Sequence, residues 1–361
     1  MRRLAVIVAL LFPPTVAFAQ ARSPAGETIS PDLEPAVARG LAYLARQQQP
    51  DGSFQNREPA GDPKEPPRFT GPKVALTGLS LMAYLASGRM PDTGKHGLAV
   101  RNAVDYLVKA CPADDGYFGK VDGSRMYGHA IATPALAEVY GMEADAAQRR
   151  GVHSALTRAV AVLLRAQATQ KEEPHRGGWR YEIGSTDSDL SVSGWCILAL
   201  RAAHNAGIEV PRESADRAAA FVLNCWRPDA KGFAYQPGGA ATLTMTASAV
   251  LDLNLLDRGT TREARQAAAF LARTPVDDKT EYPYYARYYT TQAAFQAGGD
   301  VWPTVWNRTQ ADLLKLQHDQ KDADGSWPPS RTANEPGQTY ATAMSVLTLA
   351  VPLRLLPTYQ R

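Results

Sequence analysis

The stretch "AVARGLAYLARQQQPDGSF" (residues 36–54) joins a helical pattern to a glycine turn and a final aromatic residue. Its apolar residues recur at the three- and four-residue spacing of one helix face, and the glycine permits the positive φ with which helices commonly end. The turn recurs, less regularly, in "CPADDGYF" (111–118), "RGGWRY" (176–181), "KGFAY" (231–235) and "DGSW" (324–327). A second apolar helical stretch follows each copy, so the unit returns after roughly 40 to 60 residues and predicts about six helical hairpins.

The composition is that of an ordinary globular protein, with 361 residues of which 45% are hydrophobic and 21% charged. Ala and Leu dominate over the β-branched residues that strands prefer, which predicts an all-α fold. One hairpin cannot bury its apolar face alone, whereas six stacked hairpins can close into an (α/α)6 toroid, with an open superhelix as the alternative. In the toroid the second helix of each hairpin lies inside, where small residues let backbones approach. Such residues stand at matching places: Thr77-Gly78, Ser193-Gly194, Thr246-Ala247 and Thr342-Ala343.

The N-terminus has the form of a cleaved secretory signal. It combines a basic start (Arg2, Arg3), an apolar run over residues 4–12 and the small residues Ala17 and Ala19 at an Ala-x-Ala site. The sequence thus predicts a signal peptide over 1–19, an N-terminal linker over 20–34 and a single toroid domain over 35–361. We expect an exported protein, periplasmic or extracellular.

Charge and motif content exclude several classes of partner and cofactor. The formal net charge is only +3, two units of which come from Arg2 and Arg3, so nothing favours a nucleic acid or an anionic membrane as partner. No later apolar run approaches the roughly 20 residues of a membrane span, so we expect no integral membrane segment after signal cleavage. The histidines and the three cysteines show no H-x-x-x-H or C-x-x-C pairing, and nucleotide and nucleophile-elbow motifs do not occur, so we expect neither a metal nor another cofactor.

The turn carries a family resemblance. Gln48 followed by "QPDGSF" is similar to the Q-x-x-x-G-x-W motif of squalene-hopene cyclases and of the related repeats in protein prenyltransferase β subunits, with Phe54 in place of Trp. The resemblance extends over nearly the whole predicted mature chain and implies the α/α toroid of that family. Prenyltransferase β subunits hold zinc partly through a D-x-C pair, which none of the three cysteines here completes.

The segment "DSDL" (187–190) resembles a partial D-x-D-D acid motif of those cyclases. The resemblance implies that Asp189 is the proton donor and Asp187 the first acid of the motif, with Leu190 in the place of the last. Protonation of an alkene needs a carboxyl whose pKa is raised by burial and by a neighbouring carboxylate. The alternative is structural, because residues 186–189 are all of types favoured at helix N-caps. Both interpretations stay open at the level of sequence.

Further candidate residues stand where the inner helices are expected to begin. If the ring closes, Lys73, His129 and Arg287 should surround one mouth of a central cavity together with Asp189. The alternative is that helix starts simply tolerate polar residues.

Aromatic residues gather in "EYPYYARYYTTQ" (281–292) and around the acid segment. Tyr285 and Tyr288 can stabilise a cation, stack on a sugar or bind an apolar ligand, and Trp179, Tyr181 and Trp195 would form one cavity wall. The alternative is that these rings only fill the core.

Three functions are compatible with these residues. The first is a terpenoid-processing enzyme that initiates cyclisation of a polyprene with Asp189. The second is a binding or scaffold module that holds a hydrophobic small molecule (an isoprenoid) or a protein partner. The third, ranked below both, is a polysaccharide lyase or hydrolase in which Asp187, Asp189, His129 and Arg287 act as acids and bases. The resemblance itself adds a constraint: the related cyclases enclose substrate between two helical domains and prenyltransferases need a second subunit, whereas this chain holds one predicted toroid.

Overall fold

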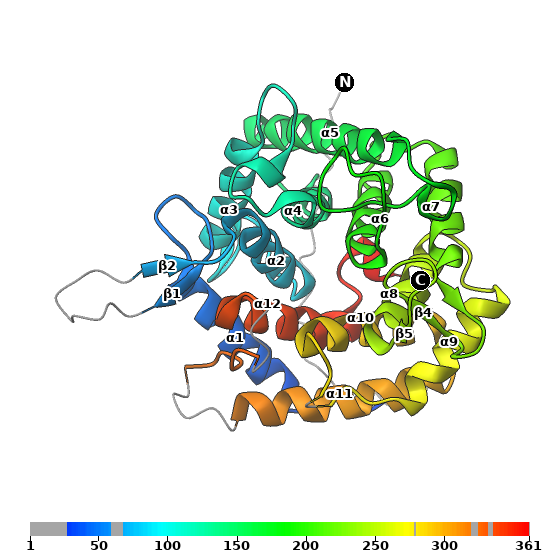
Figure 1. Cartoon of the computed structure of the whole chain (residues 1–361). Helices are drawn as coiled ribbons and strands as arrows, with labels where there is room; N and C mark the ends of the chain where they lie inside the picture. The colour runs from blue at the N-terminus through cyan, green and yellow to red at the C-terminus, as the bar shows by residue number, and fades with distance from the viewer. Residues whose placement is uncertain (1–26, 59–67, 278, 319–323, 331–334, 361) are drawn as a thin grey trace, which may run out of the picture.

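The structure is a computed structural model that describes residues 27–58, 68–277, 279–318, 324–330 and 335–360. The predicted signal peptide lies outside the described residues. Within them, twelve α-helices alternate between an outer and an inner layer (Figure 1). The outer helices are α1 (Leu33–Gln47), α3 (Gly97–Ala110), α5 (Ala146–Ala168), α7 (Arg212–Asn224), α9 (Arg262–Arg273) and α11 (Val301–His318). The inner helices are α2 (Lys73–Ala86), α4 (Arg125–Val139), α6 (Leu190–Asn205), α8 (Leu243–Leu255), α10 (Pro283–Ala297) and α12 (Gly337–Ala350).

The inner helices form a closed ring. Each packs on the inner helix before it and the one after it, and α12 returns to pack on α2 (Figure 1). The predicted (α/α)6 toroid is therefore confirmed, and the open superhelix is wrong. Helix α1 begins at Leu33, inside the segment expected as a linker, and packs on α11 and α12.

Short strands and 3₁₀-helices occupy the connections. Antiparallel β1 (Asn56–Glu58) and β2 (Arg68–Thr70) form one sheet, and β3 (Trp226–Arg227), β4 (Gly232–Ala234) and β5 (Ala241–Thr242) form another. The 3₁₀-helices are η1 (Phe118–Lys120), η2 (Glu173–His175), η3 (Val351–Leu353) and η4 (Pro357–Tyr359).

The two layers differ because their sequences differ. Outer helix α9 buries only Ala264, Ala267, Ala268 and Leu271, the single stripe of an amphipathic helix. Inner helix α2 is buried at every position from Val74 to Ala86. Small residues bring the inner backbones together as predicted: a Cβ added to Gly78 would lie 3.0 Å from the Ile131 carbonyl oxygen of α4.

Glutamine side chains tie three of the turns to the next outer helix. Gln48 Nε2 donates to the carbonyl of Gly52 in its own turn at 3.1 Å and to that of Ala99, at α3 of the next hairpin, at 2.8 Å. Gln317 makes the equivalent pair across the closure of the ring, to Gly325 at 2.8 Å and Ala36 at 3.0 Å. Gln167 does the same within the ring, bonding the carbonyls of Gly177 and Ser214. The glutamine of the turn motif is thus a brace between hairpins.

The aromatic residue of each turn is buried between the layers. Its backbone N–H donates to a side chain one turn into the following inner helix, for example from Trp179 to Ser193 Oγ at 2.9 Å. The other pairs are Phe54 with Thr77, Phe118 with His129, Phe233 with Thr246, and Trp327 with Thr342. The small polar residues at matching places therefore anchor the turns as well as permit close packing.

No helix of the described residues is long and apolar enough to cross a membrane. Cys111, Cys196 and Cys225 are all buried free thiols.

Candidate functional site

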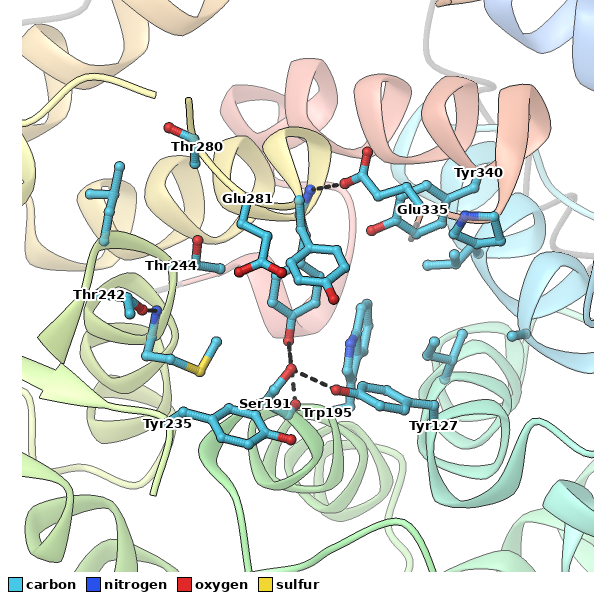
Figure 2. Close-up of a pocket in the computed structure, with 18 of the residues that line it drawn as sticks. Tyr127, Ser191, Trp195, Tyr235, Thr242, Thr244, Thr280, Glu281, Glu335 and Tyr340 are labelled. Atoms are coloured by element: carbon cyan, nitrogen blue, oxygen red, sulfur yellow. Dashed lines mark hydrogen bonds between the residues drawn. The ribbon is translucent and has the colours of Figure 1, made fainter. Parts of the chain in front are cut away.

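A cavity of about 1000 Å³ opens at the end of the ring where all six inner helices begin (Figure 2). One part of its wall is aliphatic and comes from α2, α4 and α8. Residues within 274–277 and 279–282, in the loop before α10, border the cavity. The aliphatic lining includes Ala75, Leu76, Leu79, Ile131, Leu243 and Met245, and the aromatic lining includes Tyr127, Tyr181, Trp195, Tyr235, Tyr285 and Tyr340.

Three of the predicted binding residues line this cavity: Tyr181, Trp195 and Tyr285. Tyr288 lies behind them, stacked on Trp195 with ring centroids 6.0 Å apart and planes within 8°. Tyr289 packs edge-on against Trp195 at 5.9 Å. The tyrosine-rich start of α10 therefore supplies both a cavity wall and the layer that supports it.

Asp189 is the N-cap of α6. Its Oδ1 accepts the N–H of Val192 at 2.8 Å, and its Oδ2 accepts a hydrogen bond from Arg180 Nη1 at 2.8 Å. Burial raises the pKa of this fully buried carboxyl, while the bonds from Val192 and Arg180 oppose the rise. Both oxygens thus bond protein groups, as expected if Asp189 serves as a helix N-cap.

Asp187 shares the same arginine. Its Oδ2 lies 3.2 Å from Arg180 Nε and accepts a hydrogen bond from Gln236 Nε2 at 3.1 Å. Arg180 thus lies between the two carboxylates and pairs with both. Its positive charge opposes the rise that burial causes in the pKa of Asp189.

The residues predicted to surround the mouth are placed elsewhere. Lys73 pairs with Asp51 at 3.2 Å on the surface. His129 lies in the core, where Nδ1 accepts the N–H of Phe118 at 3.3 Å and Nε2 bonds the carbonyl of Ala159 at 3.0 Å. Burial lowers the pKa of His129 to about 4, so its imidazole is neutral.

Two further predicted residues also face protein. Arg287 is buried on α10. Trp179 is the turn aromatic of the third hairpin, with Nε1 donating to the carbonyl of Leu163 at 2.8 Å. The expectation that these side chains gather at the cavity is therefore corrected. For His129 the reason is that its ring holds the preceding turn through the N–H of Phe118.

Sequence reasoning missed Tyr127, Ser191 and Tyr235, which join the predicted residues in hydrogen-bond networks. Tyr127 Oη donates to Ser191 Oγ at 2.8 Å, and Ser191 Oγ lies 3.0 Å from Tyr285 Oη (Figure 2). Tyr235 Oη accepts from Arg180 at 2.7 Å and lies 2.6 Å from Tyr181 Oη. A signal for Tyr235 existed, because it follows the turn aromatic by two residues in "GFAY" as Tyr181 does in "GWRY".

Two glutamates at the cavity also escaped prediction. Glu335, in the loop before α12, caps α10: its Oε1 accepts the N–H groups of Tyr284 at 3.2 Å and Tyr285 at 3.4 Å. Burial raises its pKa. Glu281 is exposed at the border of the cavity (Figure 2). Both stand in loops outside the repeat pattern, so no local signal marked them.

One buried carboxyl lies outside the cavity lining. Asp252 on α8 is fully buried, and its Oδ2 accepts a hydrogen bond from Ser248 at 3.3 Å. Burial holds its pKa well above the usual range. Gly194 on α6 leaves room for this pair. Within the part of the chain that the structure describes, no three His, Cys, Asp or Glu side chains gather as metal ligands.

No family model matches the chain, and no curated protein is significantly similar to it in sequence. Several solved structures are similar in fold. A protein from Actinoplanes is 18% identical with a TM-score of 0.54, over 91% of this chain and 99% of that one. The type II terpene cyclase MstE from Scytonema is 14% identical with a TM-score of 0.55, over 90% and 99% of the two chains.

Glycosidases are similar to the same degree. One, solved in complex with glucose, is 11% identical with a TM-score of 0.57, over 90% of this chain and 98% of that one. Identities this low establish the fold alone. The chain is thus an α/α toroid of the kind found in a terpene cyclase and in glycosidases.

Proposed function

We propose that this protein binds a hydrophobic small molecule of the isoprenoid class in the central cavity. The observation that carries the proposal is the cavity itself, about 1000 Å³ in volume with aliphatic and aromatic walls built from the first turns of the inner helices. Small-molecule sites are concave, mostly apolar and roughly 300 to 1,000 Å³ in size. A long apolar ligand fits such a volume.

The proposal does not include cyclisation initiated by Asp189. An acid for alkene protonation must present a protonated oxygen to the ligand, but both oxygens of Asp189 are held by Val192 and Arg180. Binding therefore accounts for the geometry without a chemical step. Support for the ligand class comes from a variant of the cyclase MstE, 13% identical with a TM-score of 0.56, which was solved in complex with geranylgeranyl dihydroxybenzoate.

A second candidate is action on a carbohydrate. It rests on Glu281 and Glu335, two carboxyls among the lining residues beside aromatic rings that can stack on sugars. Glycoside hydrolysis uses such a pair of carboxyls. The acid and base of this version are Glu281 and Glu335, since none of Asp187, Asp189, His129 and Arg287 is among the lining residues. Release of reducing ends from a polysaccharide panel, abolished in Glu281→Gln, supports it over binding alone.

The main proposal is tested by comparing lipid binding to the wild type with binding to a variant in which a bulky side chain fills part of the cavity. Purified protein is incubated with a prenylated probe lipid and bound lipid is quantified by mass spectrometry after extraction. Ala75→Phe places a ring in the cavity from α2 and should lower affinity at least about tenfold. Ala220→Phe, the same change at an exposed position of α7, is the matched control. Equal binding by both variants, or none by the wild type, contradicts the proposal.

Export is part of the proposal. It rests on the signal-like N-terminus, and the test is N-terminal sequencing of protein recovered outside the cytoplasm. Cleavage near Ala19 supports it, whereas an intact Met1 in a cytoplasmic fraction contradicts it.

A further inference from the structure

The C-terminal residues close the end of the ring that lies opposite the cavity mouth. All six inner helices begin at the cavity, so their last turns lie together at the other end. From the end of α12 the chain packs on α10 through η3 and on α6 through η4, and Figure 1 shows it in red running from α12 toward α6. In between, Leu355 passes the end of α2: a Cβ added to Gly88 would lie 3.2 Å from Leu355 Cδ1. Residues 354–360 therefore form a strap across this end of the ring.

Few interactions attach the strap to the ring. Among the groups that the structure describes, the hydrogen bonds between them are two, both from Thr358 to Glu138 Oε1 in the last turn of α4. The Thr358 N–H donates at 3.2 Å, and Thr358 Oγ1 donates to the same oxygen. The Arg354 guanidinium lies 5.0 Å from the centre of the Phe295 ring, and Leu356 is 1% exposed. A segment with so few contacts can open without unfolding the ring.

The strap begins at a strained residue. Arg354 has a φ of 54° and a ψ of 30°, in the left-handed region that is unfavourable for a residue with a Cβ. Its N–H donates to the carbonyl of Val351 at 3.2 Å, so the chain leaves η3 and changes direction here. Release of the strap would relieve this conformation. The backbone at Arg354 thus favours opening, and the bonds to Glu138 oppose it.

Glu138 couples the strap to pH. The residue is 4% exposed, and its Oε2 has no hydrogen-bond partner among the described groups. Burial raises its pKa from 4.5 to about 7, and the bonds from Thr358 oppose the rise. No described charged group changes this pKa. The charged or titratable groups around this end of the ring are Arg89, Glu143, Arg149, His153, Arg201, His204 and Arg354.

We infer that the strap is a pH-sensitive gate, shut in acid and increasingly open as the pH rises toward neutrality. When the strap leaves, water reaches Glu138 and its carboxyl ionises at its ordinary pKa, so protons bind the closed form more tightly. Below pH 4.5 the carboxyl is protonated in both forms and opening does not depend on pH. Between pH 4.5 and about 7 the open form ionises first, and the ratio of open to closed protein rises by up to about 300-fold. The inference is independent of the proposed ligand, because the cavity opens at the other end of the ring.

The test is amide hydrogen exchange of the full-length protein, measured by mass spectrometry between pH 4.5 and 8. Rates are divided by those of an unstructured peptide, because exchange itself accelerates with pH. A peptide that covers the strap reports its opening, and peptides from α8 report global unfolding. Glu138→Gln removes the titrating group, and Glu209→Gln, the same change in an exposed loop, is the matched control. Thr358→Val weakens the attachment but leaves Glu138 in place.

We expect protection of the strap to fall by up to about 300-fold from pH 4.5 to 7 in the wild type and in Glu209→Gln, and to stay constant in Glu138→Gln. Thr358→Val should lower protection at every pH and keep the fall. At each pH the strap should be less protected than α8. Strap protection that does not change with pH in the wild type overturns the inference, and so does an equal fall in Glu138→Gln. Equal protection of the strap and α8 also overturns it, since the strap then leaves only when the whole protein unfolds. If Glu138→Gln does not fold, the wild type and Thr358→Val decide between these outcomes.

Discussion

Asp189 accepts a hydrogen bond from Arg180 at 2.8 Å while its other oxygen caps helix α6, and Arg180 in turn donates to the lining residue Tyr235. One residue thus joins the start of an inner helix to the wall of the cavity. The resemblance to a cyclase acid motif implies that Asp189 is a proton donor, whereas in the structure its oxygens accept from Val192 and Arg180.

Two replacements of Asp189 should lower the free energy of unfolding by different amounts. Asp189→Asn retains an oxygen for the Val192 N–H but loses the charge that pairs with Arg180, so we expect a loss of about 1 kcal/mol in the free energy of unfolding. Asp189→Ala loses the cap as well and should cost about 2 to 4 kcal/mol. Urea unfolding followed by circular dichroism measures both. Equal stability of the two variants would contradict the capping role.

The brace across the ring closure should contribute to global stability. Gln317→Ala removes the bonds to Ala36 and Gly325 and leaves two buried carbonyls without that donor, so we expect a loss of about 2 kcal/mol. Gln48→Ala, the same change inside the ring, should cost a similar amount. Gln266→Ala, on outer helix α9, is the control and should change stability by less than about 0.5 kcal/mol. An unchanged Gln317→Ala melting temperature contradicts closure through this contact.

Stability should fall as pH rises from 4.5 to about 7, because of Glu138. This α4 carboxyl accepts hydrogen bonds from Thr358 of the C-terminal segment, and burial raises its pKa from 4.5 to about 7. Below pH 4.5 the group is protonated in both folded and unfolded states. Above it the unfolded chain ionises first, so up to about 3 kcal/mol of stability is lost through this window.

The check is thermal unfolding of the wild type and Glu138→Gln at several pH values. The difference in stability between them should change across this window, since glutamine does not titrate. A constant difference contradicts the raised pKa.

Close packing of α6 on α8 depends on Gly194. A Cβ there would lie 2.5 Å from Ser248 Oγ, so Gly194→Ala should cost about 1 to 3 kcal/mol despite the better helix propensity of alanine. Ser248→Ala removes the obstructing oxygen, and the double variant should recover at least half of the loss. A double-mutant cycle from chemical unfolding measures the coupling; strict additivity contradicts it.

The sequence predicted the ring because its signals are local and repeated. The glycine that ends a helix, the brace such as Gln48 and the small residues such as Gly78 each act within one hairpin or on the next. Trp195 and Tyr285 could be predicted as cavity residues because they lie one turn into inner helices. These features follow from periodicity alone.

The remaining site residues depend on contacts between distant segments. His129 occupies the place that Thr77 and Ser193 fill elsewhere, so its imidazole serves the turn and not the cavity. Glu335 reaches α10 across a hairpin boundary, and the Tyr127 network joins α4, α6 and α10. No pattern within one repeat determines which side chains of different hairpins form hydrogen bonds with one another.

The central claim, that the ring holds a hydrophobic ligand at its inner helix starts, is tested most directly by photo-crosslinking. A prenyl probe with a diazirine is irradiated with the full-length protein, and labelled peptides are mapped by mass spectrometry. The account predicts labels on lining residues such as Leu76, Trp195 and Tyr285, suppressed by excess unlabelled prenyl alcohol. Labels confined to the outer helices, or labelling that competitor does not suppress, would contradict it.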